Sequence, residues 1–287
     1  GTGRTLTVSR GKTLTLDNKL TLDGAGQVNL GGTGATTLTG SGEIVVNSGI
    51  LQNNGGSGSG VLALTKSGNG TQVLSGANTY SGATSVGGGI LRISHSSALG
   101  STAAGTTVTS AATLEISGGI STGEALTLQG NNSASSANQL VSVSGNNTIT
   151  ANISTTSGGT NHSITSLADK LTIDANVSPI VSGTRPLYLR GAGNGEITGG
   201  FNKGSADTAP LIKEGTGTWT LSGTSTYNGD TTISGGSLQV GNGGTTGRLA
   251  ATSAIPHTVV IAASCADEAE AFMAQAIQRL GEARRRG

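Results

Sequence analysis

The chain has 287 residues, of which 50 are glycine, 11% are charged and 2% are aromatic, and its formal net charge is +1. Glycine this frequent without a Gly-X-Y period excludes collagen, and the low net charge with recurrent Val, Ile and Thr argues against disorder. No basic stripe is present that would hold a nucleic acid, and the single cysteine, Cys265, excludes an intramolecular disulfide framework. The composition therefore favours a β-protein with many tight corners.

Short alternating pieces begin at Thr5 and continue along most of the chain. In each piece two apolar residues flank a threonine or another polar residue, so both apolar side chains point to one face of a strand. The pieces are too short for hairpin layers, and the connectors are too short for crossover helices. They are Leu6–Val8, Leu14–Leu16, Leu20–Leu22, Val28–Leu30, Ile44–Val46, Leu114–Ile116, Leu126–Leu128 and Leu171–Ile173.

A solenoid satisfies these constraints, because each strand then bonds to its equivalent one coil later, with a coil of roughly 20–25 residues. We predict that residues 5–246 form a single parallel β-helix whose lumen buries four leucines in particular: Leu16, Leu128, Leu221 and Leu238. Asn-Gly corners such as Asn194-Gly195 are also the strongest hairpin signal, so an antiparallel sandwich or propeller is the structural alternative.

Three polar stretches interrupt this pattern: Asn131–Asn138, Ser154–Ser163 and Asn202–Thr208. We expect them to be loops that leave the rod. Loops on a rigid scaffold are where binding usually occurs, although solvated connectors are the simpler interpretation.

Two segments repeat each other. Lys66–Ile93 and Lys213–Val240 align without a gap and are identical at 14 of 28 positions. Short strand pieces alternate with glycine corners in both, as in stacked repeats that bury their apolar residues only against neighbouring coils.

The second copy closely resembles the passenger-associated transport repeat of bacterial autotransporters, and the first is a looser copy. The residues that carry the resemblance are Gly215, Gly217, Thr218–Gly223, Thr226-Tyr227, Gly229, Thr231-Thr232 and Gly235-Gly236. The resemblance implies a right-handed parallel β-helix that a C-terminal β-barrel exports through the outer membrane, with the repeats assisting transport or folding. This sequence shows no signal peptide, no barrel strands and no run of 18 apolar residues, so we expect a mature protein or a fragment without a membrane span.

The pattern stops near Arg248, so we expect a β-helix over residues 1–249 and an atypical tail over residues 250–287. Thr258–Ala262 has the composition of a short buried strand. From Ser264, apolar residues at spacings of three and four predict an amphipathic α-helix, which either caps the last coil or is an extraneous segment. Its apolar face would comprise Phe272, Met273, Ile277 and Leu280, and Arg284–Arg286 follow in solvent.

No catalytic, cofactor-binding or metal-binding residues are predicted. The three histidines, His95, His162 and His257, lack metal-ligand spacing and are expected in solvated or turn positions. Ser57 lies in a linker-like Gly-Ser run rather than a nucleophile elbow. Gly193–Gly195 lacks the strand-to-helix context of a dinucleotide site.

Two further groups of residues favour other functions weakly. Trp219 and Tyr227 would suit a carbohydrate-stacking pair but are expected in the core or at a corner. Four charges, at Asp169, Asp174, Arg185 and Arg190, are near each other in sequence, as a polysaccharide-degrading β-helix would require, but are expected to be isolated surface charges.

Paired threonines suggest a third function, because outward Thr ladders on a solenoid can bind ice. The irregular intervals between the pairs argue against one aligned face. The pairs are Thr5/Thr7, Thr13/Thr15, Thr37/Thr39, Thr107/Thr109, Thr148/Thr150 and Thr218/Thr220.

Taken together, the sequence predicts a non-enzymatic, secreted or surface-exposed passenger segment that acts as a stalk or adhesin-type scaffold. Its ligand would be a host surface or a glycan, and its full-length protein would include a β-barrel translocator. The alternatives are a polysaccharide-degrading enzyme and an ice-binding solenoid.

Overall fold

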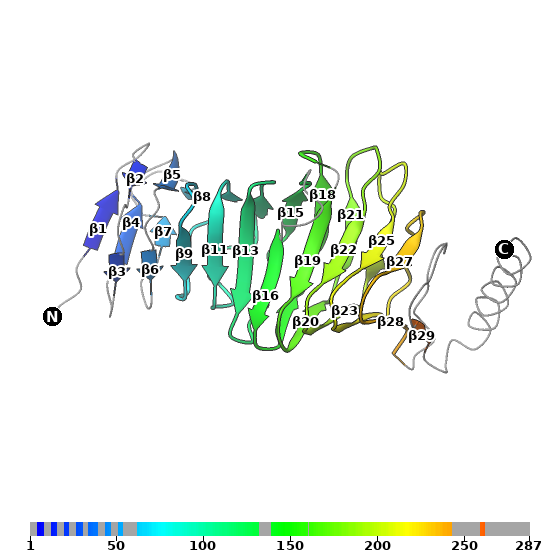
Figure 1. Ribbon diagram of the computed structural model, residues 1–287. Helices are drawn as coiled ribbons and strands as arrows, with labels where there is room; N and C mark the ends of the chain where they lie inside the picture. Colours follow the sequence, from blue (N-terminus) through cyan, green and yellow to red (C-terminus); the bar gives the residue numbers. More distant parts are fainter. Residues whose placement is uncertain are drawn as a thin grey trace, which may run out of the picture.

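The computed structural model describes residues 62–242 except 132–138 and 160. Outside that range it describes only the backbone of the strands up to Asn53 and of Val259–Ile261. Every regular element in these residues is a β-strand. The strands form four sheets, A to D, and the strands of each sheet follow one another along the length of the molecule (Figure 1).

Sheets A and B contain the first two strands of the chain. In spatial order, sheet A comprises β1 (Thr5–Val8), β4 (Gln27–Leu30) and β7 (Leu51–Asn53). Sheet B comprises, in the same sense, β2 (Thr13–Thr15), β5 (Gly34–Thr39), β8 (Leu62–Lys66), β10 (Thr84–Val86), β12 (Thr106–Val108), β15 (Leu126–Gln129), β18 (Ile153–Thr156), β21 (Asn176–Pro179) and β24 (Gly200–Phe201).

Sheets C and D complete the fold. Sheet C comprises β27 (Thr231–Ile233), β25 (Leu211–Lys213), β22 (Leu187–Arg190), β19 (His162–Ser166), β16 (Leu140–Ser144), β13 (Ala112–Ser117), β11 (Gly89–Ile93), β9 (Thr71–Leu74), β6 (Ile44–Val46) and β3 (Leu20–Leu22). Sheet D comprises β14 (Ser121–Thr122), β17 (Asn147–Ile149), β20 (Lys170–Ile173), β23 (Asn194–Ile197), β26 (Thr218–Leu221), β28 (Ser237–Val240) and β29 (Val259–Ile261).

The chain visits the sheets in rotation, so that β15, β16 and β17 form one coil and β18, β19 and β20 form the next. Every strand pair is parallel and joins one coil to the following one. Leu140 lies opposite Ile164 and Leu187 lies opposite Leu211, which is a period of 24 residues. The parallel β-solenoid is therefore confirmed within the described strands, and the only antiparallel contact there is an isolated bridge between Asn131 and Asn161.

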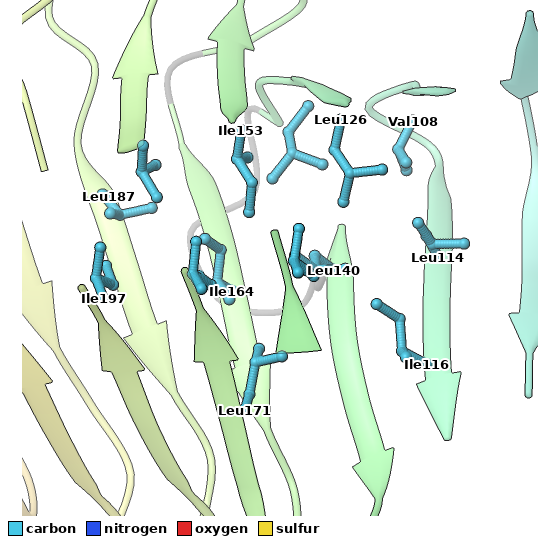
Figure 2. Close-up of a cluster of buried hydrophobic side chains, with 14 of the residues drawn as sticks. Val108, Leu114, Ile116, Leu126, Leu140, Ile153, Ile164, Leu171, Leu187 and Ile197 are labelled. Atoms are coloured by element: carbon cyan, nitrogen blue, oxygen red, sulfur yellow. The ribbon is translucent and has the colours of Figure 1, made fainter. Parts of the chain in front are cut away.

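The core is a continuous apolar lumen, because alternate residues of each strand point inward. Figure 2 shows side chains from several sheets meeting there, among them Leu126, Leu140 and Ile164. Leu128, Leu221 and Leu238 are buried as predicted. Leu16 lies outside the residues whose side chains are described.

Both repeats contain a coil that is shorter than the 24-residue coils. Val86 lies opposite Lys66, and Ile233 lies opposite Lys213, a period of 20 residues in both copies. Each copy contributes strands to two sheets instead of three: copy 1 to sheets B and C, copy 2 to sheets C and D. Sheet A ends just before copy 1 and sheet B just before copy 2. A repeat thus omits one strand, and the omitted face differs between the copies.

The predicted loops are confirmed only in part. Asn202–Thr208 is a turn, although Ala206 within it is fully buried. The loop prediction for Ser154–Ser163 is wrong at both ends, where the chain belongs to β18 and β19. The third stretch, after Asn131, lies outside the described residues.

The tail prediction is confirmed only for its strand. Strand β29 falls within the predicted Thr258–Ala262 and pairs in parallel with β28. The predicted helix after Ser264 lies outside the described residues. In the part of the chain that is described, no helix is long and apolar enough to cross a membrane.

Candidate functional site

Each repeat contains an inward-pointing lysine that is fully buried, which is unusual for a charged side chain. In copy 1, Lys66 ends β8 and is fully buried, as is Leu64 two residues before it. Its Nζ atom donates to the main-chain carbonyl oxygens of Ser67 at 3.0 Å, Gly68 at 2.9 Å and Gly88 at 2.9 Å. An ammonium has three N–H donors and no acceptor, so these three carbonyls use its hydrogen-bonding capacity completely.

Copy 2 reproduces this arrangement. Lys213 ends β25, is fully buried, and donates to the carbonyls of Glu214 at 2.9 Å, Gly215 at 2.9 Å and Gly235 at 3.0 Å. Burial lowers the pKa of each lysine to about 8, and the Glu214 carboxylate opposes this effect at Lys213. Both amines are therefore predominantly protonated at neutral pH.

A tyrosine occupies the omitted face in each copy. Tyr80 and Tyr227 are buried and lie in the segments that replace a strand. Their hydroxyl groups are 2.6 Å from the hydroxyls of Thr84 and Thr231, respectively. Burial raises the pKa of both phenols. The ring thus fills the lumen, while its hydroxyl is satisfied within the same repeat.

In copy 2 this segment also covers the end of sheet B. The amides of Thr226 and Tyr227 donate to the carbonyl of Phe201 in the last strand, at 3.1 and 3.2 Å. The Phe201 and Tyr227 rings stack with centroids 5.2 Å apart. An unpaired strand edge invites association with another chain, and here the repeat itself occupies that edge.

Glycines at matching corners of the two copies have the same backbone conformation, with positive φ. Gly68 and Gly215 have φ of 74°, and Gly89 and Gly236 have φ of 61° and 63°. A Cβ on Gly236 would lie 2.5 Å from the carbonyl oxygen of Gly215, one of the lysine acceptors. Only glycine allows the two corners to approach this closely.

Trp219 distinguishes the two copies and is not exposed for carbohydrate stacking. Its side chain is fully buried, and its indole N–H donates to the carbonyl of Arg190 at 3.2 Å. A Cβ on Gly195, opposite it in sheet D, would lie 2.4 Å from the ring. Copy 1 has the buried Gln72 at this position. The core interpretation of Trp219 and Tyr227 is confirmed.

The outward face of sheet B has a feature that the sequence did not reveal. One hydroxyl residue from each of six successive strands lies in register, half-exposed, next to its neighbours. We call this row the hydroxyl ladder: Thr65, Ser85, Thr107, Thr127, Ser154 and Ser178.

The threonine pairs themselves do not make one face. Thr107 is on sheet B, whereas Thr148 and Thr218 are on sheet D. In sheet D the threonine column is interrupted, because Thr172 pairs with Glu196 and Glu196 with Thr220. The prediction that the pairs do not form one aligned face is therefore confirmed, although Thr13 and Thr15 lie opposite Thr37 and Thr39. The hydroxyl ladder arises from single residues one coil apart.

Charged groups on sheets C and D pair between neighbouring coils. Arg92 contacts Glu115 at 2.6 Å, and Arg190 contacts Glu214 at 2.8 Å while lying 4.5 Å from the Tyr188 ring centroid. On sheet D, Lys170 contacts Glu196 at 2.5 Å. These contacts join three pairs of neighbouring coils at the surface.

The four charges considered for a polysaccharide-degrading site have separate partners. Asp169 accepts from the Gly145 amide at 2.7 Å, and Asp174 accepts from the Thr198 hydroxyl at 2.6 Å. Arg185 donates to the Gly159 carbonyl at 3.1 Å. The prediction of isolated charges is wrong for Arg190, which is paired with Glu214.

The histidine predictions have mixed outcomes. His95 is in a turn, where its Nδ1 accepts from the Ser97 amide at 3.0 Å, as predicted. His162 is instead buried in β19, and its Nε2 lies 3.0 Å from the Thr156 carbonyl. Burial lowers the pKa of His162. His257 and Ser57 lie outside the described residues, and in the rest no cluster of His, Cys, Asp or Glu is suited to a metal ion.

A polar network in the lumen follows copy 1. Thr84 lies opposite Thr106, whose hydroxyl donates to Glu124 Oε1 at 2.8 Å. Glu124 is buried, and within the described residues its second carboxylate oxygen has no hydrogen-bond partner. Burial raises the pKa of this carboxyl group, an effect that the Thr106 hydrogen bond opposes.

Comparison with known proteins supports the class indicated by the repeats. Residues 64–93 and 211–240 match the Passenger-associated-transport-repeat family. A stretch of 67 residues, 23% of this chain, is 43% identical to the Adhesin BmaC autotransporter of Brucella suis biovar 1 (strain 1330). The aligned part is 2% of that protein. No solved structure matches the chain.

These findings confirm the resemblance predicted from the sequence. The fold and the two repeats define a β-solenoid of the autotransporter passenger type, with passenger-associated transport repeats at 64–93 and 211–240. Both matches indicate a secreted or cell-surface location at the outer membrane.

Proposed function

We propose that the chain is a non-enzymatic passenger segment that acts as a stalk or adhesin-type scaffold, and that its two repeats aid export and folding. The observation that carries this proposal is the identical lysine and tyrosine geometry of two matched transport repeats within one parallel solenoid. In the full-length protein a β-barrel translocator would complete the export route. We also propose a right-handed coil, since strand-to-parallel-strand crossovers almost always have that hand.

The surface chemistry supports a scaffold more than an enzyme. Arg190 is paired with Glu214, and Asp169, Asp174 and Arg185 each contact a different segment of the chain. General acid–base catalysis requires two groups positioned on one substrate. The charges considered for that role instead join neighbouring coils or corners.

Two assays on the purified chain test this proposal. The first measures its saturable binding to host cells and to a glycan array, and we expect binding without turnover. The second incubates the chain with pectin and other acidic glycans and follows unsaturated products. Sustained product formation would favour the polysaccharide-degrading alternative and overturn the non-enzymatic proposal.

The hydroxyl ladder supports ice binding as a second candidate function. The six residues are uncharged and, at the strand spacing of about 4.8 Å, form a regular row. Thermal hysteresis of the purified chain tests this function directly. Thr107→Lys should abolish hysteresis, whereas Thr220→Lys, on sheet D, should leave it intact. Absence of hysteresis in the wild-type chain would exclude this candidate.

The predicted boundary near residue 249 and the role of the tail remain proposals. We propose that residues 264–287 cap the last coil. Deleting them should lower the melting temperature or cause association of the rods. A truncated chain that stays monomeric with an unchanged melting temperature would identify the tail as an extraneous segment.

A further inference from the structure

Each repeat places a charged side chain in the apolar lumen. Alternation in β8 directs Leu64 and Lys66 inward and leaves Thr65 half-exposed. A leucine or methionine at the position of Lys66 would satisfy the apolar lumen, and burying a charged amine instead is costly. The same costly choice occurs 147 residues later at Lys213. The lysine must therefore provide something that an apolar side chain does not.

The acceptors show what the amine provides. Two of the three carbonyls, Ser67 and Gly68, belong to the corner that directly follows the lysine. The third, Gly88, belongs to the corner one coil later. In copy 2, Glu214 and Gly215 form the first corner and Gly235 the second. One ammonium therefore joins two successive corners.

The lysine hydrogen bonds lie in the coils that have two strands instead of three. A 24-residue coil pairs with the next coil through strands in three sheets, whereas a repeat coil pairs through strands in two sheets. Alternating burial in these strands opposes a one-residue slip, but a two-residue slip would leave every side chain on its own face. The lysine would lose its acceptor in the second corner in such a slip, so it opposes that slip.

We propose that Lys66 and Lys213 are registry latches, in which the ammonium binds carbonyls of two successive corners and fixes the register of the two-strand coil as the repeat folds. The latch deepens the proposed role of the repeats in folding and rests on it in that respect. It requires a cation with three N–H donors, and not merely a side chain of this length. Methionine has similar length and no donor, and arginine has a planar fork of donors that does not match three converging carbonyls.

Local hydrogen exchange on the full chain is the first test. Lys213→Met should speed exchange at least tenfold in β27 and β28 and leave β10 and β11 unchanged. Lys66→Met should give the reverse pattern. Lys203→Met, at a half-exposed turn lysine, is the matched control and should change neither region. Unchanged exchange in both repeat variants, or an equal effect of the Lys203 variant, would overturn the proposal.

Chemical rescue separates the latch from simple packing. Alanine at position 213 removes three methylene groups and the amine, which n-propylammonium replaces atom for atom. Refolding of Lys213→Ala should slow about tenfold and recover in n-propylammonium chloride. It should not recover in tetramethylammonium chloride, which has no N–H donor, or in n-propanol, which has no charge. Recovery in n-propanol would show that the stem only fills space, and failure of all three would also contradict the latch.

If a variant does not fold alone, n-propylammonium is added during refolding, and the same three solutes are compared for the yield of folded chain. These measurements need neither an export apparatus nor a ligand. A failed latch therefore leaves the passenger proposal standing, and a failed binding assay leaves the latch standing.

Discussion

The buried lysine corners of the repeats and the exposed corners of the coils between them are closed by opposite chemistry. In the 24-residue coils, exposed asparagine side chains accept hydrogen bonds from main-chain amides one coil away. Asn146 Oδ1 accepts from the Lys170 amide at 3.1 Å, and Asn152 Oδ1 accepts from the Asn176 amide at 3.0 Å. In the repeats, a buried ammonium donates to main-chain carbonyls. Water can replace an exposed acceptor, but nothing replaces a buried donor. The comparison indicates that exposed corners such as that of Asn152 tolerate substitution, whereas corners closed by a buried donor do not: those of the repeats and that of Asn147.

The largest loss of stability is expected at the position where the two copies differ in the core, Trp219 in copy 2 and Gln72 in copy 1. Trp219→Ala removes a buried ring packed over Gly195 and should lower the free energy of unfolding by about 3–5 kcal/mol. Gln72→Ala, at the matching position of copy 1, should cost less because a smaller side chain is lost. Urea unfolding measures both variants. An equal loss would show that the copies do not differ in packing here.

Leucines in the lumen should not distinguish repeats from other coils. Leu221→Ala in copy 2 and Leu128→Ala in β15 should each lower the free energy of unfolding by about 2–5 kcal/mol, because both side chains are fully buried. Leu167→Ala, at a residue 48% exposed, is the control and should have little effect. A loss at only one of the buried positions would contradict a continuous lumen.

An intermediate effect is expected at the polar network near copy 1. Because burial raises the pKa of Glu124, the protonated carboxyl is favoured in the folded chain. The resulting stability is fully present below the ordinary glutamate pKa and is lost as the pH rises through the folded pKa. Glu124→Gln should remove this pH dependence, and Tyr80 is the titratable group that faces it. Urea midpoints across this pH range, compared between wild type and variant, measure the effect; identical pH profiles would refute it.

Much of the solenoid follows from the sequence, because Leu-Thr-Leu alternation and glycine corners are local signals. The strand at 259–261 and the burial of Trp219 were also predictable. The burial of His162 was not, because a polar composition at 154–163 indicated a loop while the β-ladder determined the structure. Lys66 carried a usable signal, since alternation after Leu64 places it inward. The omitted strand was not predictable, because it depends on pairing one coil away.

The tyrosine hydroxyls should show equal, smaller effects in the two copies. Tyr80→Phe and Tyr227→Phe each remove a hydrogen bond to a buried threonine, and each should lower the free energy of unfolding by about 0.5–1.5 kcal/mol. Thermal unfolding measures both. A difference between the copies well above this range would mean that the omitted faces are not equivalent.

The smallest expected effect is at the exposed corners. Asn152→Ala removes the acceptor of the Asn176 amide, which water can then occupy, and should change the free energy of unfolding by about 0.5 kcal/mol or less. Urea unfolding measures this change as well. A loss similar to that of the leucine variants would contradict the distinction between exposed and buried corners.

The direction of the strand pairing has a mechanical consequence. Hydrogen bonds between coils run along the length of the rod, so tension between its two ends loads them in series (Figure 1). A coil at an end would peel away before its interior neighbours. Each peeled coil of 24 residues would release about 80 Å of extended chain, and each 20-residue repeat coil about 70 Å. Single-molecule stretching of the rod would therefore record shorter steps at the repeat coils than at the 24-residue coils.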